Sequence, residues 1–317
     1  MSTQPMQANQ PDIIELNKDQ VVGHADHWAT LTQHIVDDVP NWLQKHIDTA
    51  TLPTPLVDDV NYSKHTILLS GNEAVHINQI IAVDMAGKPK TFLNAYPSVN
   101  SPYGVWASVE NVLCCNDCHD AILRLKCDDG TVLYAFDKLY AINKNAYEKD
   151  KRYYVNLSAL AYQVAPSSKS EVIKVEDPES IRYHRAFNDI LTANNGTPPA
   201  DLQAQIANWQ PDANILPLEP IEINVGHMCA YLFGDTIGQQ DEAWIQGQIL
   251  GKQLTTFNDI ALSLLDVVIL RESLDSPVVI RLAIPTLGLP TLEVGDYIKA
   301  NIWLQAAIYK ENQYPKK

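Results

Sequence analysis

A cluster of residues that can bind metal lies within the range 114–119, in the sequence Cys-Cys-Asn-Asp-Cys-His. Thiolates and an imidazole at such short spacing can ligate zinc, so the spacing predicts Cys115, Cys118 and His119 as metal ligands. A structural zinc site usually takes further ligands from a second segment. Cys127 is a poor candidate because it alternates with leucines, which predicts that it faces a core. The interpretation that we favour is a loop of small, partly buried thiols that holds no cofactor, and zinc is the alternative.

A second candidate site lies in residues 138–154, where tyrosines alternate with lysines and an arginine. Aromatic rings can stack on bases while cations hold phosphates, as in single-stranded nucleic-acid binding. The residues predicted to bind are Tyr147, Lys151, Arg152 and Tyr153. The alternative interpretation is a basic loop whose tyrosines cover one end of a barrel.

The charge of the chain opposes nucleic-acid binding. The 317 residues contain 23 Lys and Arg against 38 Asp and Glu, a formal net charge of −15. Such a field repels phosphates and anionic lipid, and it favours a basic protein partner. We therefore expect a protein as the partner, with nucleic acid an unfavoured alternative and no membrane association; the sequence predicts no oligomeric state.

Known catalytic motifs are missing from the chain. It has no Gly-x-Ser-x-Gly, no phosphate-binding glycine-rich loop and no His-Glu-x-x-His. Adjacent acidic pairs such as Asp37 and Asp38 adjoin turns or prolines, where aspartate caps backbone groups. The sequence therefore favours a non-catalytic binding or assembly protein, such as an acidic inhibitor or immunity-type protein. The rival functions are a metal-dependent enzyme or zinc-stabilised module and a single-stranded nucleic-acid binder.

The expected location is a reducing cytoplasm. The N-terminus lacks the basic start and apolar stretch of a secretory signal, and no run of about 18 apolar residues is present. The five cysteines are odd in number and three of them are crowded together, which is unlike a secreted disulfide framework.

The pattern of the chain predicts a mainly β protein with helical additions, of the α+β class. The expected order is a disordered tail (1–12), a helical N-terminal segment (13–60), a first β-barrel-like domain (61–165), a helical linker (166–217) and a second β-barrel-like domain (218–317). Alternating apolar residues on both sides of residues 128–130 predict a β-hairpin. Asp177 before Pro178 predicts a helix start, and Asn195 followed by glycine predicts a helix end.

The two β blocks resemble each other, which indicates an internal duplication of a small barrel or sandwich of oligonucleotide-binding (OB) type. Chance similarity between short β patterns is the alternative. A tryptophan occupies the same point of one strand in each block, and the final strands share leucine, alanine and tyrosine in register. The residues predicted to be equivalent core positions are Trp106, Leu157 and Tyr162 in the first block and Trp244, Leu304 and Tyr309 in the second.

Overall fold

The computed structural model describes residues 9–16, 26–45, 47–57, 64–115, 119–128, 130–167, 172–195, 197–211, 219–224, 230–233, 239–273 and 276–310. The chain forms two compact units, one of residues 1–167 with 229–317 and one of residues 168–228. No helix in the described ranges combines the length and the apolar character needed to cross a bilayer.

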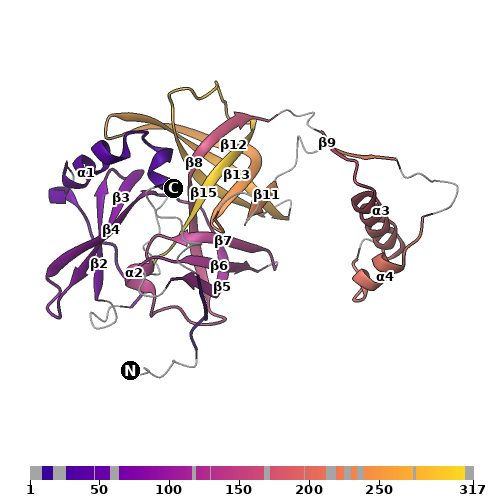
Figure 1. Cartoon of the computed structure of the whole chain (residues 1–317), viewed down its shortest axis with the longest axis horizontal. Helices are drawn as coiled ribbons and strands as arrows, with labels where there is room; N and C mark the ends of the chain where they lie inside the picture. The colour runs from indigo at the N-terminus through magenta and orange to yellow at the C-terminus, as the bar shows by residue number, and fades with distance from the viewer. Residues whose placement is uncertain are drawn as a thin grey trace. The chain divides into compact units, whose positions relative to one another are not determined.

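The first unit is built mainly of strands (Figure 1). Its strands are β1 (Asp12–Glu15), β2 (His65–Gly71), β3 (Val75–Val83), β4 (Pro89–Val99), β5 (Gly104–Cys114), β6 (Ile122–Cys127), β7 (Val132–Asp137), β8 (Arg152–Pro166), β11 (Ala230–Phe233), β12 (Glu242–Phe257), β13 (Ile260–Ser273), β14 (Ser276–Pro285) and β15 (Tyr297–Ile308). Its helices are α1 (Ile35–Lys45) and α2 (Tyr140–Asn143), with 3-10 turns at Asp26–Thr30 and Ile47–Thr49.

Ten strands form one mixed sheet that contains two closed rings. In the first ring β5, β6 and β7 are antiparallel, β7 pairs in parallel with β15, β15 pairs with β8, and β8 returns to β5. In the second ring β12, β13 and β14 are antiparallel, β14 pairs in parallel with β8, and β15 returns to β12. The rings share β8 and β15, so each ring contains a strand from the other half of the chain.

Each shared strand changes its partner at one leucine. Asn156 is the last residue of β8 that pairs with β5, and Ser158 is the first that pairs with β14. On β15 the pairing changes in the same way between Trp303 and Gln305, from β12 to β7. The residues at the two changes are Leu157 and Leu304, and both are fully buried.

The pairing registers agree with the predicted equivalences. Trp106 faces Tyr154 of β8, and Trp244 faces Asn301 of β15. Leu157 lies three residues after Tyr154, and Leu304 lies three residues after Asn301. The alignment that matches the two tryptophans therefore also matches the two leucines, and both halves use the same order of pairings.

Alternating side chains of the rings fill a common apolar core. On β15, Ile298, Ala300, Ile302, Leu304 and Ala306 all belong to this core. The period of two residues is that of a strand with one face turned inward.

A second apolar layer covers the outside of the rings. It contains residues of the separate sheet β2-β3-β4 together with residues of β8 and of β12 to β15. Helix α1 contributes Trp42, whose ring contacts those of Trp28 and Phe257.

The second unit contains the antiparallel pair β9 (Val172–Val175) and β10 (Ile221–Asn224) and the helices α3 (Pro178–Ala193) and α4 (Leu202–Asn208). The predicted start of α3 is confirmed, because the Asp177 side chain accepts a hydrogen bond of 2.7 Å from Ser180 N and Pro178 is the first helical residue. Asn195 adopts the left-handed conformation, with φ 54°, as predicted for a helix end. Ala186, Ile190 and Ile206 form a small core of this unit.

The structure confirms a mainly β chain of the α+β class and the hairpin of β6 and β7. It differs from the prediction of two separate OB-like domains, because both β blocks contribute strands to each ring. The segment 13–60 is also not wholly helical, since β1 is a strand. Strand β4 was not predicted; its prolines, Pro89 and Pro97, are tolerated because β4 lies at a sheet edge.

Two of the six predicted core residues are wrong. Trp106 is 46% exposed and Tyr162 is 37% exposed, because both lie on outward faces of their strands. Trp244 and Tyr309 are half-buried.

Candidate functional site

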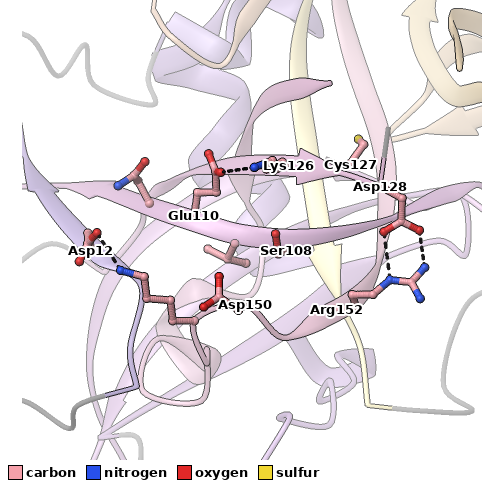
Figure 2. Close-up of a pocket in the computed structure, with 11 residues that line it drawn as sticks. Asp12, Ser108, Glu110, Lys126, Cys127, Asp128, Asp150 and Arg152 are labelled. Carbon is pink, nitrogen blue, oxygen red and sulfur yellow. Dashed lines mark hydrogen bonds and ion pairs between the residues drawn. The ribbon is translucent and has the colours of Figure 1, made fainter. Parts of the chain in front are cut away.

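A pocket of about 400 Å³ opens on the outer side of β5 (Figure 2). We call it the β5-edge pocket. Its lining comes from β1, β5, the end of β6 with the turn after it, and the start of β8 with the turn before it. The lining residues are Asp12, Ser108, Val109, Glu110, Asn111, Lys126, Cys127, Asp128, Lys149, Asp150 and Arg152.

The pocket lies where one edge of β5 is incompletely paired. Along this edge β8 pairs with residues 104–108 and β1 pairs with residues 111–114, while β6 occupies the other edge. Val109 and Glu110 therefore pair with neither β8 nor β1. A bulge between Val109 and Asn111 interrupts the pairing with β6 at the same place. Bulges commonly re-aim side chains or end pairing next to functional sites.

Ion pairs already engage the cations of the pocket. The pairs are Lys149 with Asp12 at 3.3 Å, Lys126 with Glu110 at 3.4 Å, and Arg152 with Asp128 through two hydrogen bonds. Asp150 forms no ion pair with any described residue, and Figure 2 shows it between Asp12 and Arg152. Among the described residues, the carboxylate of Asp150 is thus the one in the pocket that has no cation as partner, and it lies beside the uncharged Ser108 and Asn111.

Strand β1 is weakly attached to this edge. It pairs in parallel with β5 over only four residues, from Asp12 opposite Asn111 to Glu15 opposite Cys114. All four residues are exposed, including Ile13 at 57% and Ile14 at 44%. Because little apolar area is buried, hydrophobic burial contributes little to the attachment of β1.

The predicted nucleic-acid platform is not assembled. Tyr147 is 1% exposed and Tyr153 is 7% exposed, so neither ring is free to stack on a base. Lys151 pairs with Glu148, and Arg152 pairs with Asp128 and lies over the Trp106 ring, 5.1 Å from its centroid. The prediction that these tyrosines and cations form a binding surface is wrong, because the tyrosines pack inward and carboxylates neutralise the cations.

Of the three predicted metal ligands, the structure describes Cys115 and His119. Cys118 lies outside the described residues, and Cys115 is in a disulfide bond. A disulfide sulfur is not a thiolate, so Cys115 is not a zinc ligand in this structure. The His119 ring lies 4.5 Å from the His65 ring, centroid to centroid. Within the described ranges, no group of three or more His, Cys, Asp and Glu side chains could hold a metal ion.

A buried polar centre at the end of β7 was not predicted from the sequence. Asp137 is fully buried and accepts hydrogen bonds from Tyr147 Oη and, at 2.9 Å, from Leu139 N. Lys138 Nζ donates to Val99 O at 2.6 Å and to Ser158 Oγ at 3.1 Å. The backbone carbonyl of Lys138 accepts two further hydrogen bonds, from Asn78 and Tyr96.

Burial shifts the pKa values of both charged side chains in this centre. Desolvation raises the pKa of Asp137 to about 7, although the Tyr147 hydrogen bond opposes the rise. Desolvation also lowers the pKa of Lys138 to about 7, against the attraction of Asp137. Perturbed pKa values often mark functional sites. Here the side chains of Asp137 and Lys138 are closed to solvent, so we assign the centre a structural role.

Sequence reasoning missed most of the β5-edge pocket. Of the predicted site residues only Arg152 lines it. Ser108, Asn111 and Asp150 carry no motif, and Asp12 was placed in a disordered tail. One feature of the sequence could have indicated a strand at this site: two β-branched residues, Ile13 and Ile14, lie between the acidic residues Asp12 and Glu15.

Comparison of the chain with family models, with curated proteins and with solved structures gave no match in any of the three. The β5-edge pocket and its surroundings are therefore interpreted from their own geometry.

Proposed function

We propose that this chain is a non-catalytic binding or assembly protein that contacts another protein at the β5-edge pocket. One observation carries the proposal: in the described part of the chain, the edge of β5 is paired by β8 at one end and by the exposed strand β1 at the other, and the gap between them adjoins a pocket of about 400 Å³. Unpaired strand edges readily add a strand from another chain.

Charge supports a protein partner over a nucleic acid. The formal net charge of −15 attracts a basic protein and repels phosphates. The cations around the pocket are already paired with carboxylates, which leaves few of them for phosphate groups. An acidic inhibitor and a subunit of a larger assembly both fit this description.

Cross-linking of captured complexes tests the proposed surface. Lys126 and Lys149 line the pocket, whereas Lys88 and Lys90 are exposed on the β3–β4 hairpin and serve as internal controls. We expect a lysine-reactive reagent to join a specifically captured protein to Lys126 and Lys149 in preference to Lys88 and Lys90. Partner cross-links that favour the control lysines, or a failure to capture any specific protein at low salt, would contradict the proposal.

A further inference from the structure

Each half of the chain pairs its first ring strand with its last, and we call this boundary the seam: β5 with β8 in the first ring and β12 with β15 in the second. In the second ring the pairs extend as far as Gln248 and Tyr297. Beyond this pair, Ile249 N donates to Asp296 O at 2.9 Å, and Gly295 N donates to Ile249 O at 2.8 Å. Gly295 has a φ of 98°, the left-handed conformation of a G1 bulge, so the chain before β15 extends the second seam.

The seam of the first ring stops earlier. Its pairs extend only as far as Ser108 and Arg152. When the two matching tryptophans are aligned, Glu148 takes the position of Gly295. A glutamate in the left-handed conformation would be strained, which disfavours the same bulge in the first ring. Glu148 N donates instead to Tyr153 Oη at 2.9 Å, so the chain before β8 does not extend the first seam in this way.

Residues 9–16 lie where the first seam has ended, and we call them the N-terminal strap. Within the strap, β1 pairs in parallel with residues 111–114 of β5. Directly after β1, Leu16 N donates to Cys114 O at 2.9 Å. The strap thus pairs with the part of the β5 edge that follows the last pair of the seam.

The strap also contacts the turn before β8. Lys149 N donates to Asn9 O at 2.8 Å, and Lys149 Nζ lies 3.3 Å from the Asp12 carboxylate. The strap therefore links β5 to the turn before β8, as the bulge at Gly295 links β12 to the turn before β15. In the first ring this link comes from a segment far away in the sequence.

These contacts hold the strap weakly in comparison with the strands of the rings. The four residues of β1 are exposed, and Pro11 is the one buried residue of the strap. The ion pair of Asp12 with Lys149 is also exposed, with 70% and 47% of the two side chains accessible, and such pairs contribute little to stability. Strands β5 and β8, in contrast, place alternate residues in the common apolar core. A segment with few buried apolar contacts opens at a lower free energy than the whole fold.

We propose that the N-terminal strap opens and closes by local unfolding while both rings stay folded. In the open state, residues 111–114 lose their partner on this edge of β5, and the β5-edge pocket loses the part of its lining that Asp12 provides. The strap thereby regulates access to the edge and the pocket. This regulatory role rests on the proposed function, whereas the motion itself involves this chain alone.

Native-state hydrogen exchange of the full-length chain, followed by NMR, tests the motion. Alternate residues of parallel strands bond to the neighbouring strand, so the bond from Leu16 to Cys114 identifies the donors across this ladder. These ladder amides are those of Ile14 and Leu16 in the strap and of Val112 and Cys114 on β5. We expect them to exchange at least about tenfold faster than the amide of Ala107, which pairs with both β6 and β8 on the same strand.

A change at Lys149 tests the contact of the strap with the turn before β8. Lys149→Gln removes the ion pair with Asp12 and keeps the backbone N–H that binds Asn9. Exchange of the ladder amides should become about two- to fivefold faster, and that of Ala107 should not change. The matched control is Lys45→Gln, which removes another exposed ion pair, with Asp259 at 3.5 Å, between α1 and the turn from β12 to β13. This control should leave the ladder amides unchanged.

Three outcomes would overturn the inference. They are exchange of the ladder amides at the rate of Ala107, exchange of the strap amides without that of Val112 and Cys114, and equal rates in Lys149→Gln and the unmodified chain. None of these readouts needs a partner, so the two proposals are tested separately. Local opening with partner cross-links away from the pocket would retain the motion and remove the proposed function. Cross-links at the pocket without local opening would do the reverse.

Discussion

Two histidines of the first unit, His76 and His65, have pKa values well below the usual value of an imidazole. His76 is 5% exposed on β3, close to the positive charge of Lys138. Desolvation and this charge lower the pKa of His76 to about 3, and desolvation lowers the pKa of His65 to about 4. Both imidazoles are therefore neutral in the native state at neutral pH, and both must be protonated when the chain unfolds in mild acid.

The first prediction concerns acid stability. A folded-state pKa below the unfolded value of 6.5 gives stability that is present above pH 6.5 and lost as the pH falls toward 3. Protonation of His76 on unfolding should remove about 1.4 kcal/mol of unfolding free energy per pH unit in this window. Urea unfolding between pH 7 and pH 4 should show a smaller loss for His76→Gln than for the unmodified chain. An unchanged pH dependence in His76→Gln would contradict the assignment.

The second prediction concerns the hydrogen bond between Tyr147 and Asp137. Tyr147→Phe removes a donor from a fully buried carboxylate, which should lower the free energy of unfolding by about 1–3 kcal/mol. The matched control is Tyr183→Phe, because the Tyr183 side chain is 44% exposed on α3, and its change should stay within about 0.5 kcal/mol. Chemical denaturation at pH 7 measures both, and equal stabilities of the two variants would show that the buried hydrogen bond is unimportant.

Among the elements, β8 and β15 determine the architecture because each takes part in both rings. Their local patterns were informative: β15 was predicted at 297–308, the range observed, and the helix start at Asp177 and helix end at Asn195 were confirmed. These features depend on neighbouring residues only. Strand β1 escaped prediction because four exposed residues have no buried face to produce a pattern.

The third prediction concerns the close contact of β12 and β13. A methyl group at Gly247 would lie 1.7 Å from the backbone oxygen of Val268, which cannot move without disturbing the sheet. Gly247→Ala should therefore lower the free energy of unfolding by at least about 2 kcal/mol in chemical denaturation. Gln253→Ala, at an exposed position of the same strand, should change it by less than about 0.5 kcal/mol. A fully stable Gly247→Ala variant would mean that these strands do not approach so closely.

At the scale of the whole molecule, the second unit is an insertion between β8 and β11 that has its own small core. The chain enters and leaves its two-stranded sheet at neighbouring points, since Val172 faces Asn224 in the antiparallel pair β9–β10. Facing residues of this kind are about 5 Å apart.

The fourth prediction follows from this geometry. Replacing residues 173–223 with a short Asn-Gly turn should leave the first unit folded, because no described residue of the insertion belongs to the core of that unit. Circular dichroism should show the loss of the helical signal of α3 and α4, and a single cooperative thermal transition should remain. An unfolded or aggregated product would show that the rings depend on the insertion.

Local chemistry in the chain was enough to predict the β-rich composition, the hairpin, the helix caps and the matching positions of the two halves, because these follow from propensity and period over a few residues. The sharing of β8 and β15, the burial of Lys138 and Tyr147, and the pocket beside β5 arise only from tertiary pairing. Strand partners far apart in sequence are selected by the packing of whole faces, and that packing decides which charges are buried and which edges stay open.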